Sequence, residues 1–83
     1  MKIQVRYFAS LREALGPQET VELPAGCTLG QLRDQLLARG GRHAEVLSRH
    51  RAVRGAVNQK MVDEDHDLAD GAEVAFFPPV TGG

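Results

Sequence analysis

Apolar and polar positions alternate near both ends of the chain, which predicts a strand at each end. Within residues 2–8 the inward side chains would be Ile3, Val5 and Tyr7, and within residues 73–77 they would be Val74 and Phe76. Successive side chains of a strand point to opposite faces of a sheet. Phe8 and Phe77 are therefore expected to point outward.

Between these two strands, one segment has apolar residues at the spacing of a helix. Thr28 and Gln31 have the spacing of a capping box, in which each side chain binds a free backbone N–H of the other residue. The apolar stripe that follows consists of Leu29, Leu32, Leu36 and Leu37. It predicts one main core helix that ends at the glycine pair 40–41. Shorter helical turns are expected at residues 9–15 and 43–50.

The remaining segments read as strands and turns. Strands are expected at residues 18–23 and 53–57, and Asn58-Gln59 would turn the chain back into a short strand at residues 61–62. The order is then strand, strand, helix, strand, short strand, strand. It fits an α+β, ubiquitin-like β-grasp fold, in which a mixed sheet packs on one main helix.

The chain changes character after the last predicted strand. Residues 1–77 would form the β-grasp domain, and residues 78–83 an extended C-terminal functional tail. Pro78 and Pro79 fix φ and offer no backbone N–H to a sheet. We therefore expect the tail to leave the domain as a stiff, extended segment.

The tail ends in Val80, Thr81, Gly82 and Gly83. Six extended residues from Pro78 span roughly 20 Å, enough to enter a pocket on another protein. The two glycines lack a Cβ, so the terminal carboxylate could pass a narrow channel. A frayed terminus is the alternative. The succession of strand, rigid spacer and glycine pair favours a functional tail with its chemistry at Gly83.

Three apolar side chains are expected on the outside of the sheet beside this tail. Phe8 and Phe77 end neighbouring terminal strands, and Met61 could join them. Such a cluster indicates a surface for a partner. The alternative is that these residues are only the edge of the core.

Composition narrows the function classes. The 83 residues allow one domain, with 42% apolar and 25% charged residues and a formal net charge of −1. This charge argues against a partner that is a nucleic acid or an anionic membrane. The alternating start is unlike a signal peptide, and no segment has the length of a transmembrane helix. We expect a cytoplasmic protein. Arginines gather between residues 39 and 54 and acids between 63 and 73, which is either solvated surface or a dipole that orients a partner.

No motif for catalysis within the domain can be identified. Cys27 is the only cysteine and is interpreted as a small hydrophobic residue, although its place before a helix leaves a reactive thiol open. The histidines are too scattered for a zinc site, and the acidic run 63–67 departs from a calcium loop where Leu68 replaces glycine. We expect no metal site. The terminal carboxylate is a poor electrophile, so it would need ATP-dependent activation by another protein.

The chain resembles the small subunit of molybdopterin synthase, a ubiquitin-like sulfur carrier. The likeness rests on four runs: Tyr7-Phe8-Ala9, Leu11-Arg12-Glu13, Ala56-Val57-Asn58-Gln59, and Leu68 with Asp70-Gly71 leading into the segment from Glu73 to Gly83. A bare glycine pair would also fit the carrier of the thiamine pathway. The Phe-Phe-Pro-Pro-Val-Thr run before it is similar to the molybdopterin branch.

The resemblance implies a sulfur-transfer cycle. A ubiquitin-activating-like adenylyltransferase would use ATP to adenylate Gly83, and a sulfur donor would convert the adenylate to a thiocarboxylate. The catalytic large subunit would then receive the tail and pass the sulfur to precursor Z, the cyclic pyranopterin monophosphate, to form the dithiolene. This chain would bind no cofactor and would be a non-catalytic subunit of a heterotetramer.

The resemblance also assigns roles to residues. Gly83 would carry sulfur and Gly82 would give clearance, while Phe8, Met61 and Phe77 would form the docking surface and residues 78–81 the inserted segment. Two alternatives stay open. The chain could supply sulfur to another pathway such as thiamine synthesis, or it could be a ubiquitin-like modifier that joins Gly83 to lysines.

Overall fold

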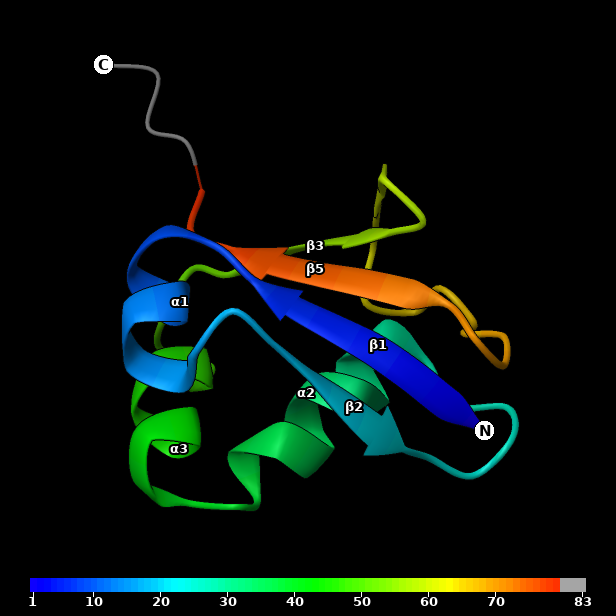
Figure 1. Ribbon diagram of the computed structural model, residues 1–83, viewed down its shortest axis with the longest axis horizontal. Coiled ribbons are helices and arrows are strands. Elements are labelled where there is room, and N and C mark those ends of the chain that lie inside the picture. Colours follow the sequence, from blue (N-terminus) through cyan, green and yellow to red (C-terminus); the bar gives the residue numbers. More distant parts are fainter. Residues whose placement is uncertain (80–83) are drawn as a thin grey trace.

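A mixed sheet with helices on one of its faces makes up the fold of the computed structural model, which describes residues 1–79 (Figure 1). Within these residues the strands are β1 (Lys2–Tyr7), β2 (Gln18–Glu22), β3 (Arg54–Val57), β4 (Lys60–Val62) and β5 (Glu73–Phe77). The helices are α1 (Ala9–Leu15), α2 (Leu29–Leu37) and α3 (Gly41–Leu47). The predicted β-grasp order of elements is confirmed.

The sheet has the strand order β2-β1-β5-β3-β4. Only the central pair β1 and β5 is parallel, with Val5 opposite Val74 and Tyr7 opposite Phe76. The other neighbours are antiparallel. The ends of β1 and β5 therefore lie side by side, at the place where the chain continues to Pro78.

The core lies between the sheet and the helices. Ile3, Val5 and Val74 are fully buried, as the alternation predicts, and the leucines of α2 pack against them. α3 adds Leu47 to this core. Burial of such side chains contributes about 1.5–3 kcal/mol each, so the inner face of the sheet is the main source of stability.

The predicted capping box at the start of α2 is present. The Gln31 N–H donates to the Thr28 hydroxyl over 3.2 Å, and the Thr28 N–H donates to the Gln31 side chain over 2.8 Å. The helix ends at Leu37, before the predicted stop. Gly40, with a φ of 72°, is the N-cap residue of α3, which begins at Gly41, two residues earlier than predicted. Because glycine adopts a positive φ without strain, Gly40 can turn the chain between the end of α2 and the start of α3.

The hairpin between β3 and β4 confirms the predicted turn. Asn58 and Gln59 have φ values of 49° and 70°. Two successive positive φ values are the mark of a type I′ turn, which fits the twist of the flanking strands. The Asn58 side chain also accepts a 3.0 Å hydrogen bond from the Glu73 N–H, so the hairpin is fixed to the start of β5.

Among residues 1–79, every helix is too short and too polar to cross a bilayer.

Candidate functional site

The base of the tail lies at the end of β5. Pro78 and Pro79 are half-buried and lead the chain away from the helical layer (Figure 1). The remaining predicted tail residues, Val80, Thr81, Gly82 and Gly83, lie outside the described part of the chain. The candidate site described below consists of residues around the point where the tail begins, at the end of β5.

Phe8 and Phe77 lie next to each other on the outer face of the sheet. The Phe8 N–H donates a 3.1 Å hydrogen bond to the Phe76 carbonyl, which continues the pairing of β1 with β5 by one residue. Since Tyr7 and Phe76 point inward, the two following phenylalanines point outward. Phe8 is 41% exposed and Phe77 is half-buried. Both are placed as the alternation predicts.

Met61 belongs to the same face, and two alanines connect it with the phenylalanines. Ala56 is paired with Met61 on one side and with Ala75 on the other. Met61 is 53% exposed, whereas Ala56 is only 7% exposed although it lies outside the core cluster. The outer face thus has a continuous apolar strip across three strands.

Sequence reasoning missed the two alanines. A Cβ on Gly55 would approach Leu29 of α2, so Gly55 faces the core and its neighbours Arg54 and Ala56 face outward. The alternation of faces along residues 54–57 could have indicated that Ala56 points outward. It was a weak signal because Gly55, Ala56 and Val57 are all buried, although they lie on alternate faces of the strand.

Two cations lie beside this apolar surface. The Arg6 guanidinium carbon lies 5.8 Å from the centre of the Phe8 ring, a cation–π distance. Arg54 is opposite Phe77 in the pairing of β3 with β5 and is exposed. We define the outer patch as Phe8, Ala56, Met61, Ala75 and Phe77.

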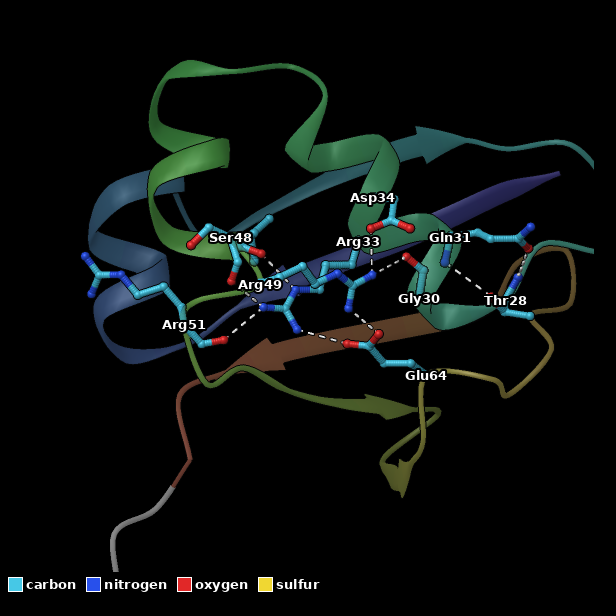
Figure 2. Close-up of polar contacts among 10 residues, drawn as sticks. Thr28, Gly30, Gln31, Arg33, Asp34, Ser48, Arg49, Arg51 and Glu64 are labelled. Atoms are coloured by element: carbon cyan, nitrogen blue, oxygen red, sulfur yellow. Dashed lines mark hydrogen bonds and ion pairs between the residues drawn. The ribbon is translucent and has the colours of Figure 1, made fainter.

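Two further arginines have structural partners: Arg33, which lies outside the predicted cluster, and Arg49, which belongs to it. Arg33 is 5% exposed and donates to the carbonyls of Leu47, Ser48 and Arg51 over 2.7–3.0 Å (Figure 2). It also binds Glu64 over 2.9 Å. These contacts attach the segment after α3 to α2, which is a structural role.

Arg49 shares Glu64 and also binds Asp34 over 2.6 Å (Figure 2). The hydrogen bond from Arg49, followed by that from Arg33, lowers the pKa of Glu64 against the opposing effect of burial. The carboxylate is thus held ionised as a structural anion. These groups lie between α2 and the segment that follows β4, and Arg33 and Glu64 line a pocket there together with Met61.

The residues weighed for other chemistry are not assembled into a site. Cys27 is half-buried and packs against the core, where it contributes as a small apolar side chain. Over residues 1–79, no group of three histidine, cysteine, aspartate or glutamate side chains is placed to hold a metal ion.

Comparison with known proteins places the chain in a family. The model of the ThiS family matches residues 5–83. The chain belongs to this family. It is 44% identical over 81 residues to the molybdopterin synthase sulfur carrier subunit of Escherichia coli strain K12, covering 98% of this chain and 99% of the relative. The corresponding subunit of Mycobacterium tuberculosis is 41% identical over 85 residues, covering 100% and 99%. The predicted resemblance to these carrier subunits is confirmed.

Solved structures agree with the fold. A putative molybdopterin converting factor subunit 1 from Pyrococcus furiosus has a TM-score of 0.81 at 32% identity, covering 96% of this chain and 99% of that one. SAMP1 from Haloferax volcanii has a TM-score of 0.80 at 26% identity over the full length of both chains. The complex of subunits 1 and 2 of the molybdopterin-converting factor from Helicobacter pylori gives 0.71 at 26%, also over both full lengths.

Proposed function

We propose that this chain is the sulfur carrier subunit of a molybdopterin synthase. The observation that carries the proposal is the position of the outer patch, which lies on one face of the sheet next to the point where β5 passes into Pro78 and Pro79. A partner that binds this patch would meet the base of the tail at the same time. The relatives named as molybdopterin synthase sulfur carrier subunits, which match over nearly their whole length, support the assignment.

The chemistry would take place at Gly83. A ubiquitin-activating-like adenylyltransferase would join the carboxylate to the α-phosphorus of ATP and release pyrophosphate. A hydrosulfide-level donor would then attack the acyl carbon through its sulfur and displace AMP, which leaves a thiocarboxylate after loss of the sulfur-bound proton. Gly82 gives clearance because it has no side chain next to the reacting carbonyl. This chain binds no cofactor in the proposal, since ATP is used by the activating enzyme.

The large subunit of the synthase would be the second partner. Phe8, Met61 and Phe77 would dock on it, and residues 78–81 would lead the thiocarboxylate into its active site. The sulfur would pass there to precursor Z, with catalysis by the large subunit. The Helicobacter pylori complex of subunits 1 and 2 supports a partner of this kind.

Intact-mass spectrometry of the protein from its own cells tests the proposal. Replacing one carboxylate oxygen by sulfur adds about 16 Da, close to the increment from oxidation of methionine or cysteine, so fragmentation must locate the change. We expect the added mass on Gly83 in cells that make molybdenum cofactor. An unmodified terminus in such cells would overturn the proposal.

A ubiquitin-like modifier is the second candidate, favoured by the similarity to SAMP1, a small archaeal modifier protein. Its Gly83 would be joined to lysines of other proteins. High-mass conjugates that disappear when residues 82–83 are deleted would support this function. Sulfur supply to the thiamine pathway is the remaining alternative. A strain that lacks this chain would then need added thiamine for growth, whereas loss of a molybdopterin synthase subunit would leave it without molybdenum cofactor.

A further inference from the structure

Two arginines stand on opposite sides of the last residues of β5. Arg6 on β1 is paired with Ala75, and Arg54 on β3 is paired with Phe77. Both side chains are on the outer face, since Val5 and Gly55 face the core. Neighbouring strands are about 4.8 Å apart, so the two Cα atoms are separated by roughly 12 Å across and along the sheet. The base of the tail emerges between them.

Neither arginine is strongly held by the domain. The Arg6 guanidinium lies 3.8 Å from the Glu73 carboxylate, and both side chains are about half exposed. Arg54 is exposed and takes part in no ion pair among residues 1–79. Arg33, Arg39 and Arg49 differ, because each donates a hydrogen bond to a carboxylate, whereas 3.8 Å is too long for one. Arg54 is thus available to an external anion, and Arg6 becomes available when an external carboxylate replaces its exposed contact with Glu73.

Charge is also unevenly distributed along the outer face. Its acids, Glu22 and Glu73, are paired with Lys2 and Gln4 near the start of β1. The end of the face that carries the outer patch has Arg6 and Arg54. An apolar surface with cations on two sides is complementary to an apolar pocket with carboxylates on two sides.

We propose that Arg6 and Arg54 form a cationic frame that steers the outer patch onto an acidic-rimmed apolar pocket of the synthase large subunit. The inference rests on the proposed function, because it assumes that the outer patch docks on that subunit. Steering by exposed charges acts mainly on the association rate, and salt screens it over about 10 Å at 0.1 M ionic strength. The frame would therefore speed docking while the outer patch provides most of the affinity.

Stopped-flow or surface-based kinetics with the large subunit from the same organism tests the frame. The double variant Arg6→Glu and Arg54→Glu should lower the association rate about tenfold at low salt and flatten its dependence on sodium chloride. Glutamine at both positions should give a smaller loss of the same kind. The matched control is Arg42→Glu, which reverses an exposed charge on α3 in the helical layer. Its association rate should stay within twofold.

Phe77→Asp separates the frame from the docking itself. If the charge variants leave both the rate and its salt dependence unchanged while Phe77→Asp weakens binding, the frame is wrong and the proposed docking stands. If Phe77→Asp also binds normally, the docking surface is wrong and the frame falls with it. Thermal unfolding of each variant verifies that the compared proteins are folded. If the double glutamate variant is not folded, the double glutamine variant is used for the comparison instead.

Discussion

The Tyr7 hydroxyl donates a 2.7 Å hydrogen bond to Oε2 of Glu19 and so connects the end of β1 to β2 beneath the outer patch. The same carboxylate binds His43 Nε2 over 2.9 Å and also pairs with Arg39. Burial, followed by the bond to Glu19, raises the pKa of Tyr7, so its hydroxyl remains a donor. Glu19 therefore joins α3, through His43, and the link between α2 and α3, through Arg39, to the sheet beside Tyr7.

Glu19→Ala should destabilise the domain. The substitution leaves the buried Tyr7 hydroxyl without its acceptor, and an unsatisfied buried polar group costs about 1–3 kcal/mol. Urea unfolding measures the loss. Glu22→Ala is the matched control because its side chain is exposed on the same strand, where the expected change is within about 0.5 kcal/mol. Equal losses in the two variants would contradict the anchoring role.

The same carboxylate predicts a pH dependence. Burial raises the pKa of Glu19, but hydrogen bonds from His43, Arg39 and Tyr7 outweigh it and lower the pKa to about 2, from an ordinary value of 4.5. Because the folded pKa is depressed, the contribution is fully present above pH 4.5 and is lost as the pH falls toward 2. Unfolding free energies between these limits should fall less steeply for Glu19→Gln. Parallel curves would show that Glu19 does not contribute.

The chain pattern predicted the sheet because its period is strong where one face is buried. Ile3, Val5, Val74 and Phe76 alternate with polar or outward residues and have the predicted positions. The capping box and the Asn58-Gln59 turn were equally local signals. Such features depend on neighbours in the sequence, so the sequence contains enough information to predict them.

Contacts between distant segments were not predictable in this way. In the sequence Arg33 is an ordinary polar position of the predicted helix. In the structure it is buried and donates hydrogen bonds to the carbonyls of Leu47, Ser48 and Arg51. Its partners become known only when α3 and the following loop are folded onto α2. The frame role of Arg54 was hidden for the same reason, because the pairing with Phe77 joins residues 23 positions apart in the sequence.

Arg33→Met should cost about 3 kcal/mol of unfolding free energy. It retains the apolar volume of the side chain but removes the donor to the Leu47 and Arg51 carbonyls, while the Ser48 carbonyl keeps its bond from the Arg51 N–H. Arg49→Met is the control: the Arg49 side chain is 43% exposed, and exposed ion pairs contribute about 0–1 kcal/mol. Urea unfolding of both variants measures the difference. A larger loss for Arg49→Met would reverse the assigned roles.

Met61→Ser should weaken docking without weakening the fold. Met61 is 53% exposed and lies outside the core cluster, so the change in unfolding free energy is expected within about 0.5 kcal/mol. Loss of its apolar contact should reduce affinity for the large subunit several-fold in isothermal titration. Val62→Ser is the opposite control, since Val62 packs against the core and its replacement should destabilise the domain. Unchanged affinity for Met61→Ser would remove this residue from the docking surface.

Deleting Gly83 should abolish sulfur transfer and leave stability unchanged. Within residues 1–79 the last core residue is Phe76, so we expect thermal unfolding to match that of the full chain. The shortened chain ends at Gly82 and retracts the carboxylate by about 3.5 Å, and a misplacement of about 1 Å can already cost 10²-fold in rate. The measurement is dithiolene formation with purified large subunit, with residue 83 restored as the positive control. Full activity of the truncated chain would show that the terminal carboxylate of Gly83 is not the sulfur-bearing group.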